Sequence, residues 1–228
     1  MGLAKHQAVL QHLQELDGVV SPKGTHLPLL EPLQPLFGGD LPKGWVVSLA
    51  AQAGSANSSL ALALAAATTA QGSWVVALGW PSLGLVAAHN LGVNLNRLVI
   101  ADVSSSEETL LALDILVGSV ELIMVNNLRL NGREHRHLTS RLRTRGTTLI
   151  SVNTSWHTTP DITLWASTLS WEGLGNGHGH LRLRRVNIRS RGRRKASQER
   201  SVQVWLPGPE GKVESASSPV PVTSLRAI

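Results

Sequence analysis

The sequence predicts an α/β fold built on a doubly wound, mainly parallel sheet. Three observations lead to this class: short runs rich in Val, Ile and Leu recur along the chain, helical windows lie between them, and the two kinds of segment alternate regularly. Apolar runs of this length are typical of strands buried on both faces. Regular strand and helix alternation implies right-handed crossovers and a parallel sheet covered by helices.

Each element of this core has its own sequence signal. The five apolar runs predict strands over residues 45–50, 74–78, 98–101, 121–125 and 147–152. The windows between them predict helices over residues 58–71, 83–91 and 105–117. The last helix follows Ser104-Ser105-Ser106-Glu107, so we expect Ser104 to cap it and Glu107 to bond back in a capping box.

After residue 153 the pattern changes to that of antiparallel hairpins. Strands are expected over residues 162–171, 181–188 and 202–206, separated by a glycine-rich segment and an arginine-rich turn. We therefore expect C-terminal hairpins that extend the parallel sheet.

Segments of different composition flank the core. Residues 1–18 have leucines at helical spacing and predict an amphipathic helix, whereas the Pro/Gly-rich residues 19–42 predict a connector without regular structure. The core is expected over residues 43–206. Residues 207–228 are rich in Pro, Gly, Ser and Glu, and we expect a flexible tail there.

Composition excludes several classes. Of 228 residues 42% are hydrophobic, and no apolar run approaches the roughly 18 residues that a bilayer span requires. The chain has no cysteine, which excludes disulfides, thiolate zinc sites and cysteine nucleophiles. The N-terminus has no signal-peptide pattern, so we expect a cytoplasmic protein.

Charge is distributed unevenly along the chain. Residues 1–128 carry 4 basic and 9 acidic side chains, whereas residues 129–228 carry 17 basic and 6 acidic ones. Such asymmetry indicates that the second half meets a polyanion or an acidic partner.

The first strand-to-helix turn of such a sheet is the usual place for phosphate, because free N–H groups and the helix dipole meet there. Here this turn is Ala51-Gln52-Ala53-Gly54-Ser55-Ala56-Asn57-Ser58-Ser59. A working phosphate loop needs a glycine, a lysine and a hydroxyl in succession, and this chain has Ala56, Asn57 and Ser58. Only the hydroxyl is retained, so the charge that offsets a triphosphate is missing.

The order of these landmarks resembles the RecA recombinase core from about Leu36 to Leu206. The resemblance is carried by five segments at close to the family's spacing: residues 41–47, 58–62, 91–98, 107–117 and 120–126. In that family an aspartate that orients magnesium follows the strand ending at Val125, and this chain has Asn126 there. The family's catalytic glutamate falls at Trp80.

The resemblance therefore implies a degenerate nucleotide site made of Ala56, Asn57, Ser58, Trp80 and Asn126. Phosphoryl transfer depends on positioning and charge neutralisation, which two amides and an indole do not supply. We expect a pseudo-ATPase with no cofactor and no metal, which neither hydrolyses ATP nor binds it in the micromolar range. The two DNA-binding loops of recombinases are also short here, so strand exchange is not expected.

A short, degenerate RecA-like chain with an extra N-terminal helix and a basic C-terminal end resembles the ImuA group, particularly its actinobacterial ImuA-prime branch. The resemblance implies a non-catalytic adaptor of the DNA-damage-induced (SOS) mutasome in error-prone translesion synthesis, in the nucleoid-associated cytoplasm. It implies ImuB as partner, an inactive relative of Y-family polymerases, and through it the sliding clamp and an error-prone C-family polymerase. In the family the C-terminal portion holds ImuB, here residues 181–206.

The residues of that segment are compatible with DNA or partner binding. Arg182 and Arg184 are expected to share one face of a strand, with leucines opposite. The candidate contacts are Arg182, Arg184, Arg185, Arg189, Arg191, Arg193, Arg194 and Lys195. The alternative is a solvated charge run that protects an edge strand from aggregation.

Three weaker signals remain. Arg133 and Arg136 recur at helical spacing and form either a second DNA-binding group or an ordinary exposed face. Trp156 is the aromatic expected to touch a base, unless it packs against its own domain. His135 and His137 lack a convincing third metal ligand nearby.

An alternative function is a residual ATP-dependent DNA-binding ATPase. In that case the missing lysine would come from Lys43 or from a neighbouring subunit.

Overall fold

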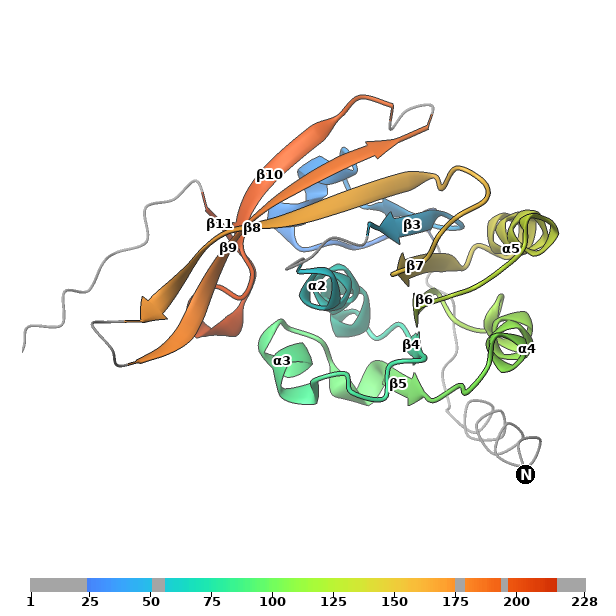
Figure 1. Cartoon of the computed structure of the whole chain (residues 1–228), viewed down its shortest axis with the longest axis horizontal. Helices are drawn as coiled ribbons and strands as arrows, with labels where there is room; N and C mark the ends of the chain where they lie inside the picture. Colours follow the sequence, from blue (N-terminus) through green and yellow to red (C-terminus); the bar gives the residue numbers. More distant parts are fainter. Residues whose placement is uncertain (1–23, 51–55, 175–178, 194–196, 217–228) are drawn as a thin grey trace, which may run out of the picture.

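One large sheet organises the protein (Figure 1). The computed structural model describes residues 24–50, 56–174, 179–193 and 197–216. Within these ranges nine strands pair in the order β11-β10-β9-β8-β3-β7-β6-β4-β5. These strands are β3 (Val46–Leu49), β4 (Val75–Leu78), β5 (Leu98–Ala101), β6 (Leu122–Asn126), β7 (Thr148–Val152), β8 (Ile162–Leu174), β9 (Gly179–Gly192), β10 (Arg200–Trp205) and β11 (Glu214–Ser215). The helices between them are α2 (Asn57–Ala70), α3 (Leu85–Asn90), η2 (Leu95–Arg97), α4 (Ser106–Leu116) and α5 (Gly132–Arg145).

The sheet has a parallel and an antiparallel part. Strands β8, β3, β7, β6, β4 and β5 are all parallel to their neighbours. Strands β9, β10 and β11 then extend the sheet by antiparallel pairing from β8. The predicted α/β class, with a mainly parallel sheet and C-terminal hairpins, is confirmed.

The parallel strands are buried on both faces, which explains their continuous apolar sequences. Alternate residues of one strand enter different cores: Val75 and Ala77 of β4 pack with α2 and α3, whereas Val76 and Leu78 pack with α4 and α5. The chain therefore runs through α2 and α3 on one face, and returns through α4 and α5 on the other.

Most predicted boundaries of the core agree with the structure to within two residues. The N-cap of α4 was predicted one residue too early, and the reciprocal bond of a capping box is not formed at the N-cap. The N-cap is Ser105, whose hydroxyl accepts the N–H of Glu108 at 3.1 Å, and the Glu108 carboxylate accepts the N–H of Ser104 at 2.7 Å. Each of three consecutive serines can cap a helix, and the register that buries Leu113 and Leu116 decides which serine is the N-cap of α4.

The Pro/Gly-rich connector is more ordered than its composition suggested. Its described part contains β1 (His26–Leu27), η1 (Glu31–Leu36) and β2 (Leu41–Pro42), and β1 pairs with β2. Leu27, Leu33, Leu36 and Leu41 are at most 1% exposed and belong to the core on the α2 face. Proline is tolerated in the first turn of a helix, and Pro32 lies there in η1. The buried leucines of the segment cover the sheet on the α2 face.

The first part of the expected flexible tail, residues 207–216, is ordered. Residues 207–216 contain η4 (Pro209–Gly211) and β11, and the N–H of Ala216 donates to the carbonyl of Gln203 at 2.9 Å. Such short elements depend on tertiary contacts and leave no periodic signal in the sequence. The helix predicted for residues 1–18 and the remainder of the tail lie outside the described residues.

Candidate functional site

Ligands of open α/β sheets bind beyond the carboxyl ends of the strands, where the chain switches from one face to the other. Here the switch lies around β3, β7 and β6, because α2 follows β3 on one face and α5 follows β6 on the other. The predicted degenerate nucleotide site falls at this edge, so its residues can be placed one by one.

Asn57, at the lysine position of a phosphate loop, joins α2 to the end of β3. Its Nδ2 donates to the carbonyl of Ala50 at 2.9 Å, and the residue is 4% exposed. Its Oδ1 is buried without a hydrogen-bond partner. Ala56 is buried in the core, whereas Ser58 is exposed on the first turn of α2. The edge therefore presents a neutral amide at the start of α2.

Asn126 ends β6 and takes part in a second amide contact. Its Oδ1 accepts a hydrogen bond from Nδ2 of Asn153 at 3.0 Å, and its Nδ2 lies 3.5 Å from the carbonyl oxygen of Gly79. These contacts connect the ends of β6, β7 and β4. Gly79 has φ +67, and a Cβ there would come within 3.3 Å of the Asn126 carbonyl, so only glycine fits this close approach.

Trp80, which the resemblance to RecA recombinases aligns with a catalytic glutamate, is 6% exposed and belongs to the core on the α2 face. Its indole therefore packs and does not point to solvent. Across the ranges that the structure describes, no group of three or more His, Asp or Glu side chains could hold a metal ion.

The loop after β7 bears out the second of the two expectations for Trp156, that it packs against its own domain. The Trp156 ring stacks on His135 of α5 at 4.4 Å, and its Nε1 donates to the hydroxyl of Ser151 at 2.9 Å. The indole is half-buried, its ring stacks on His135 and its N–H is bonded to Ser151, so it is not free to stack on a base. The sequence could not show this, because His135 lies 21 residues earlier on another element.

His135 is fully buried beneath this loop. Its Nδ1 accepts the backbone N–H of His157 at 3.0 Å, so the proton of the neutral ring sits on Nε2, which is buried without a partner. Burial lowers the pKa of His135, nearby His157 lowers it further, and Glu134 partly opposes both. The loop is thus held by a histidine that must stay neutral.

The basic residues of β9 divide between two faces. Arg184 shares the face of the buried Val186, Ile188 and Ser190 and is itself 9% exposed. The expected cationic face of Arg182 and Arg184 is therefore wrong, because that face points into the molecule at Arg184. The exposed or half-buried cations of the other face are Arg185, Arg189, Arg191 and Arg193. Arg194 and Lys195 lie outside the described residues, and Arg133 and Arg136 are exposed on α5.

The arm of the β8–β9 hairpin projects away from the body of the protein (Figure 1). It exposes three large apolar side chains: Leu169 is 50% exposed, Trp171 44% and Leu181 49%. Apolar side chains grouped on a projecting arm are typical of a protein-binding surface.

The comparison with known families concerns the part of the chain before these hairpins. The model described as the MT3502 N-terminal domain matches residues 34–158, which is 125 of the 228 residues. The chain belongs to this family. The matched span runs from η1 to the loop after β7, so it contains the carboxyl edge but none of the hairpins. No curated protein matches the chain, and none of the described helices is long and apolar enough to cross a bilayer.

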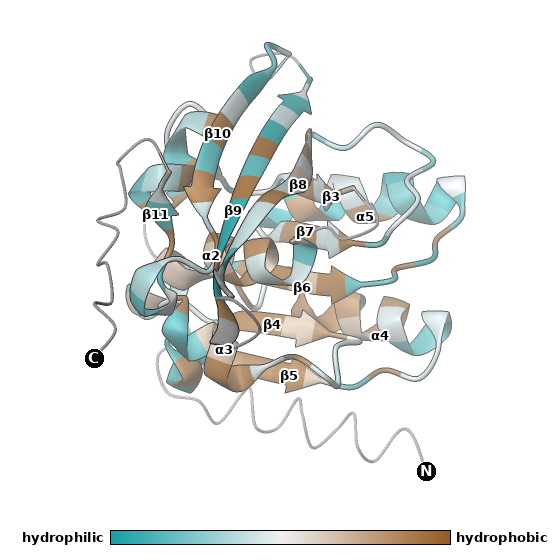
Figure 2. Ribbon diagram, turned by 60° about the vertical axis from the view of Figure 1, so that its left-hand side comes forward, coloured by the Kyte–Doolittle hydropathy of each residue, from teal (hydrophilic) through white to brown (hydrophobic). Residues whose placement is uncertain are grey.

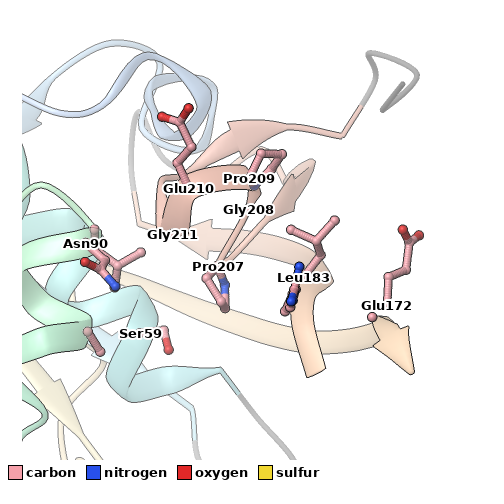
Figure 3. Close-up of a pocket in the computed structure, with 13 residues that line it drawn as sticks. Ser59, Asn90, Glu172, Leu183, Pro207, Gly208, Pro209, Glu210 and Gly211 are labelled. Carbon is pink, nitrogen blue, oxygen red and sulfur yellow. The ribbon is translucent and has the colours of Figure 1, made fainter. Parts of the chain in front are cut away.

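A cavity of about 680 Å³ lies beside the first turn of α2 (Figure 3). Its labelled walls come from α2 (Ser59), α3 (Asn90), the hairpin (Glu172, Leu183) and residues 207–211. Gly211 is required for the close approach to α3, since a Cβ there would lie 2.7 Å from that of Asn90. Glu172, Arg182 and Glu210 give the cavity charges of both signs, so it has no preference for an anion.

Arg184 holds the segments around this cavity together. Its Nε donates to the carbonyl of Leu206 at 2.7 Å, its Nη2 donates to the hydroxyl of Ser59 at 2.9 Å, and its guanidinium lies 5.0 Å from the centre of the Trp171 ring. Burial lowers the pKa of Arg184, but an arginine stays charged in a protein. It therefore joins α2, β8 and β10 through one charged group.

We expect Arg184→Ala to lower the free energy of unfolding by about 2–4 kcal/mol, because it removes two hydrogen bonds and the packing of the buried stem. Arg182→Ala, two residues away and exposed, should change it by less than about 0.5 kcal/mol. Urea denaturation of both variants and the unmodified chain measures the difference. Equal stability of the two variants would contradict the assigned role of Arg184.

We expect the stability of the protein to fall as the pH is lowered below about 6.5, because the unfolded state then binds a proton that buried His135 resists. The slope should be steeper than in His135→Asn, by at most about 1.4 kcal/mol per pH unit, the limit for one proton. His137→Gln, on the exposed side of α5, is the control and should keep the full slope. Denaturation curves between pH 5 and 7.5 test this, and an unchanged slope in His135→Asn would disprove it.

Proposed function

We propose that the chain is a non-catalytic RecA-like adaptor of a DNA-damage-induced mutasome, which binds ImuB and supports error-prone translesion synthesis. The observation that carries this proposal is the set of neutral amides at the carboxyl edge of the sheet. The RecA resemblance gives Asn57 and Asn126 the positions of the recombinase lysine and magnesium aspartate, and both side chains bond to protein groups. Phosphoryl transfer requires charge at those positions, so the edge favours a structural role.

The architecture supports the RecA-like part of the proposal. The parallel sheet carries helices on both faces and continues into antiparallel C-terminal strands, which is the arrangement that the resemblance implies. The alternative, an ATPase that uses Lys43, has no support from the fold. Lys43 precedes the amino end of β3, whereas the phosphate-loop position follows its carboxyl end.

The projecting hairpin arm supports the proposed partner. A protein interface is centred on apolar anchors that fit pockets of the partner, and Leu169, Trp171 and Leu181 are the exposed side chains of this kind on the arm. The arm belongs to the C-terminal portion, which in the ImuA group holds ImuB. We assign ImuB to this arm, and through ImuB the sliding clamp and the C-family polymerase of the nucleoid-associated mutasome.

The test is a pull-down of ImuB with the full chain, followed by titration of the affinity. The double variant Leu169→Ser/Leu181→Ser should weaken binding strongly, since each anchor that fills a partner pocket contributes about 2 kcal/mol, or roughly 30-fold in Kd. Val86→Ser is the matched control, because Val86 is 75% exposed on α3. Undiminished binding by the arm variant would move the interface elsewhere, and no binding by the unmodified chain would refute the adaptor role.

A further inference from the structure

The antiparallel part of the sheet has one face that no described helix covers. Along β8, β9 and β10 the side chains alternate between two faces: Leu164, Val186, Ile188 and Val204 are at most 1% exposed on the inner face. The opposite set, which we call the outer face, includes the exposed or half-buried Thr163, Trp165, Arg185, Arg189, Arg191 and Gln203. At its end beside β11 the same face holds Trp205, which is buried. Figure 2 shows the alternation of hydrophilic and hydrophobic bands along β9 and β10.

The outer face has an excess of positive charge. Arg193 and Arg143 share the carboxylate of Asp161 at 3.3 and 2.6 Å, and Arg189 reaches Glu199 at only 3.5 Å. Glu214, opposite Trp205 on β11, is the third carboxylate on this side. Glu172, opposite Leu183 and so on the side of Arg185, is a fourth carboxylate at the arm. Five guanidinium groups therefore face four carboxylates. The described residues provide no ion pair for Arg191, and Arg185 bonds only to the neutral Gln203 at 2.8 Å.

An aromatic ring lies among these cations. Trp165 of β8 is the cross-strand partner of Arg189, and its neighbour on the same face, Thr163, is the partner of Arg191. The indole is half-buried, so its ring rests on the sheet and leaves part of its surface to solvent. An aromatic side chain next to arginines on an open face is the combination that binds single-stranded nucleic acid, with a base on the ring and phosphates on the cations.

The spacing of the cations favours the same ligand. Arg189 and Arg191 are two residues apart on one strand face, which places them about 7 Å apart along the strand. This is close to the separation of successive phosphates in an extended single strand. A protein partner is less favoured, because interfaces between proteins have an apolar centre, whereas Trp165 stands among cations and the other tryptophan of this face, Trp205, is buried.

We propose that the outer face of β8, β9 and β10 binds single-stranded nucleic acid, with the backbone on Arg185, Arg189 and Arg191 and a base stacked on Trp165. The inference extends the adaptor role but does not depend on ImuB, and the assay contains none, so the two proposals can fail separately. The face lies outside the residues that the family model matches.

The test measures fluorescence anisotropy of labelled dT20 and rU20 with the full chain between 50 and 200 mM salt. We expect binding to weaken with salt with a log–log slope of about −2, from about −0.7 per phosphate contact and three arginines. The variant Arg189→Ala/Arg191→Ala should reduce the slope to about −0.7. The control Arg129→Ala/Arg182→Ala removes the same charge from other surfaces and should keep the slope of the unmodified chain.

Trp165→Leu separates stacking from charge. It retains an apolar side chain on the sheet but removes the aromatic ring, so affinity should fall roughly 5- to 150-fold with an unchanged salt slope. Trp171→Leu, on the hairpin arm, is the matched control. Preference for dT20 or rU20 identifies DNA or RNA as the ligand. The proposal is overturned if neither strand binds at 50 mM salt, if polyglutamate competes as well as dT20, or if the control variants lose as much affinity.

Discussion

The arrangement of the carboxyl edge depends on neutral amides that hydrogen-bond to protein groups. Asn57 bonds the start of α2 to the end of β3, while Asn126 and Asn153 join the ends of β6 and β7 beside Gly79. In an open α/β sheet these positions normally face a ligand. Here the amides hydrogen-bond to the chain itself, although Oδ1 of Asn57 is buried without a partner. We therefore propose that the protein acts through its surfaces.

The surfaces available for that activity lie on the C-terminal hairpins. The parallel strands cannot offer a free face, because α2, α3, α4 and α5 cover both sides. Beyond β8 the inner face is still covered by η1 and the connector, whereas the outer face is open around Trp165, Arg189 and Arg191. Buried Arg184 links the hairpin to α2, which fixes the arm and the outer face relative to the core. One hairpin therefore presents an apolar arm and a basic face.

The parallel core could be predicted well from the sequence because strands buried on both faces leave continuous apolar runs. Residues 24–42 and 207–216 could not, since their short elements are ordered by contacts with distant residues. The same holds for the side chains of the candidate sites. The arginine spacing on β9 predicts that the side chains alternate between two faces but not which face is buried. The sequence therefore placed Arg184 on an exposed face, whereas it is buried. The roles of Trp156 and Trp165 depend on cross-strand and helix contacts that no local pattern contains.

We propose that the uncharged residues at the carboxyl edge leave no site that binds or hydrolyses ATP. Calorimetric titration of the full chain with ATP and Mg²⁺ tests it most directly. The account predicts no saturable heat at micromolar nucleotide, because Asn57 and Asn126 supply neither the cation nor the carboxylate that a magnesium triphosphate requires. A tight one-site isotherm that disappears in Ser58→Ala would contradict it.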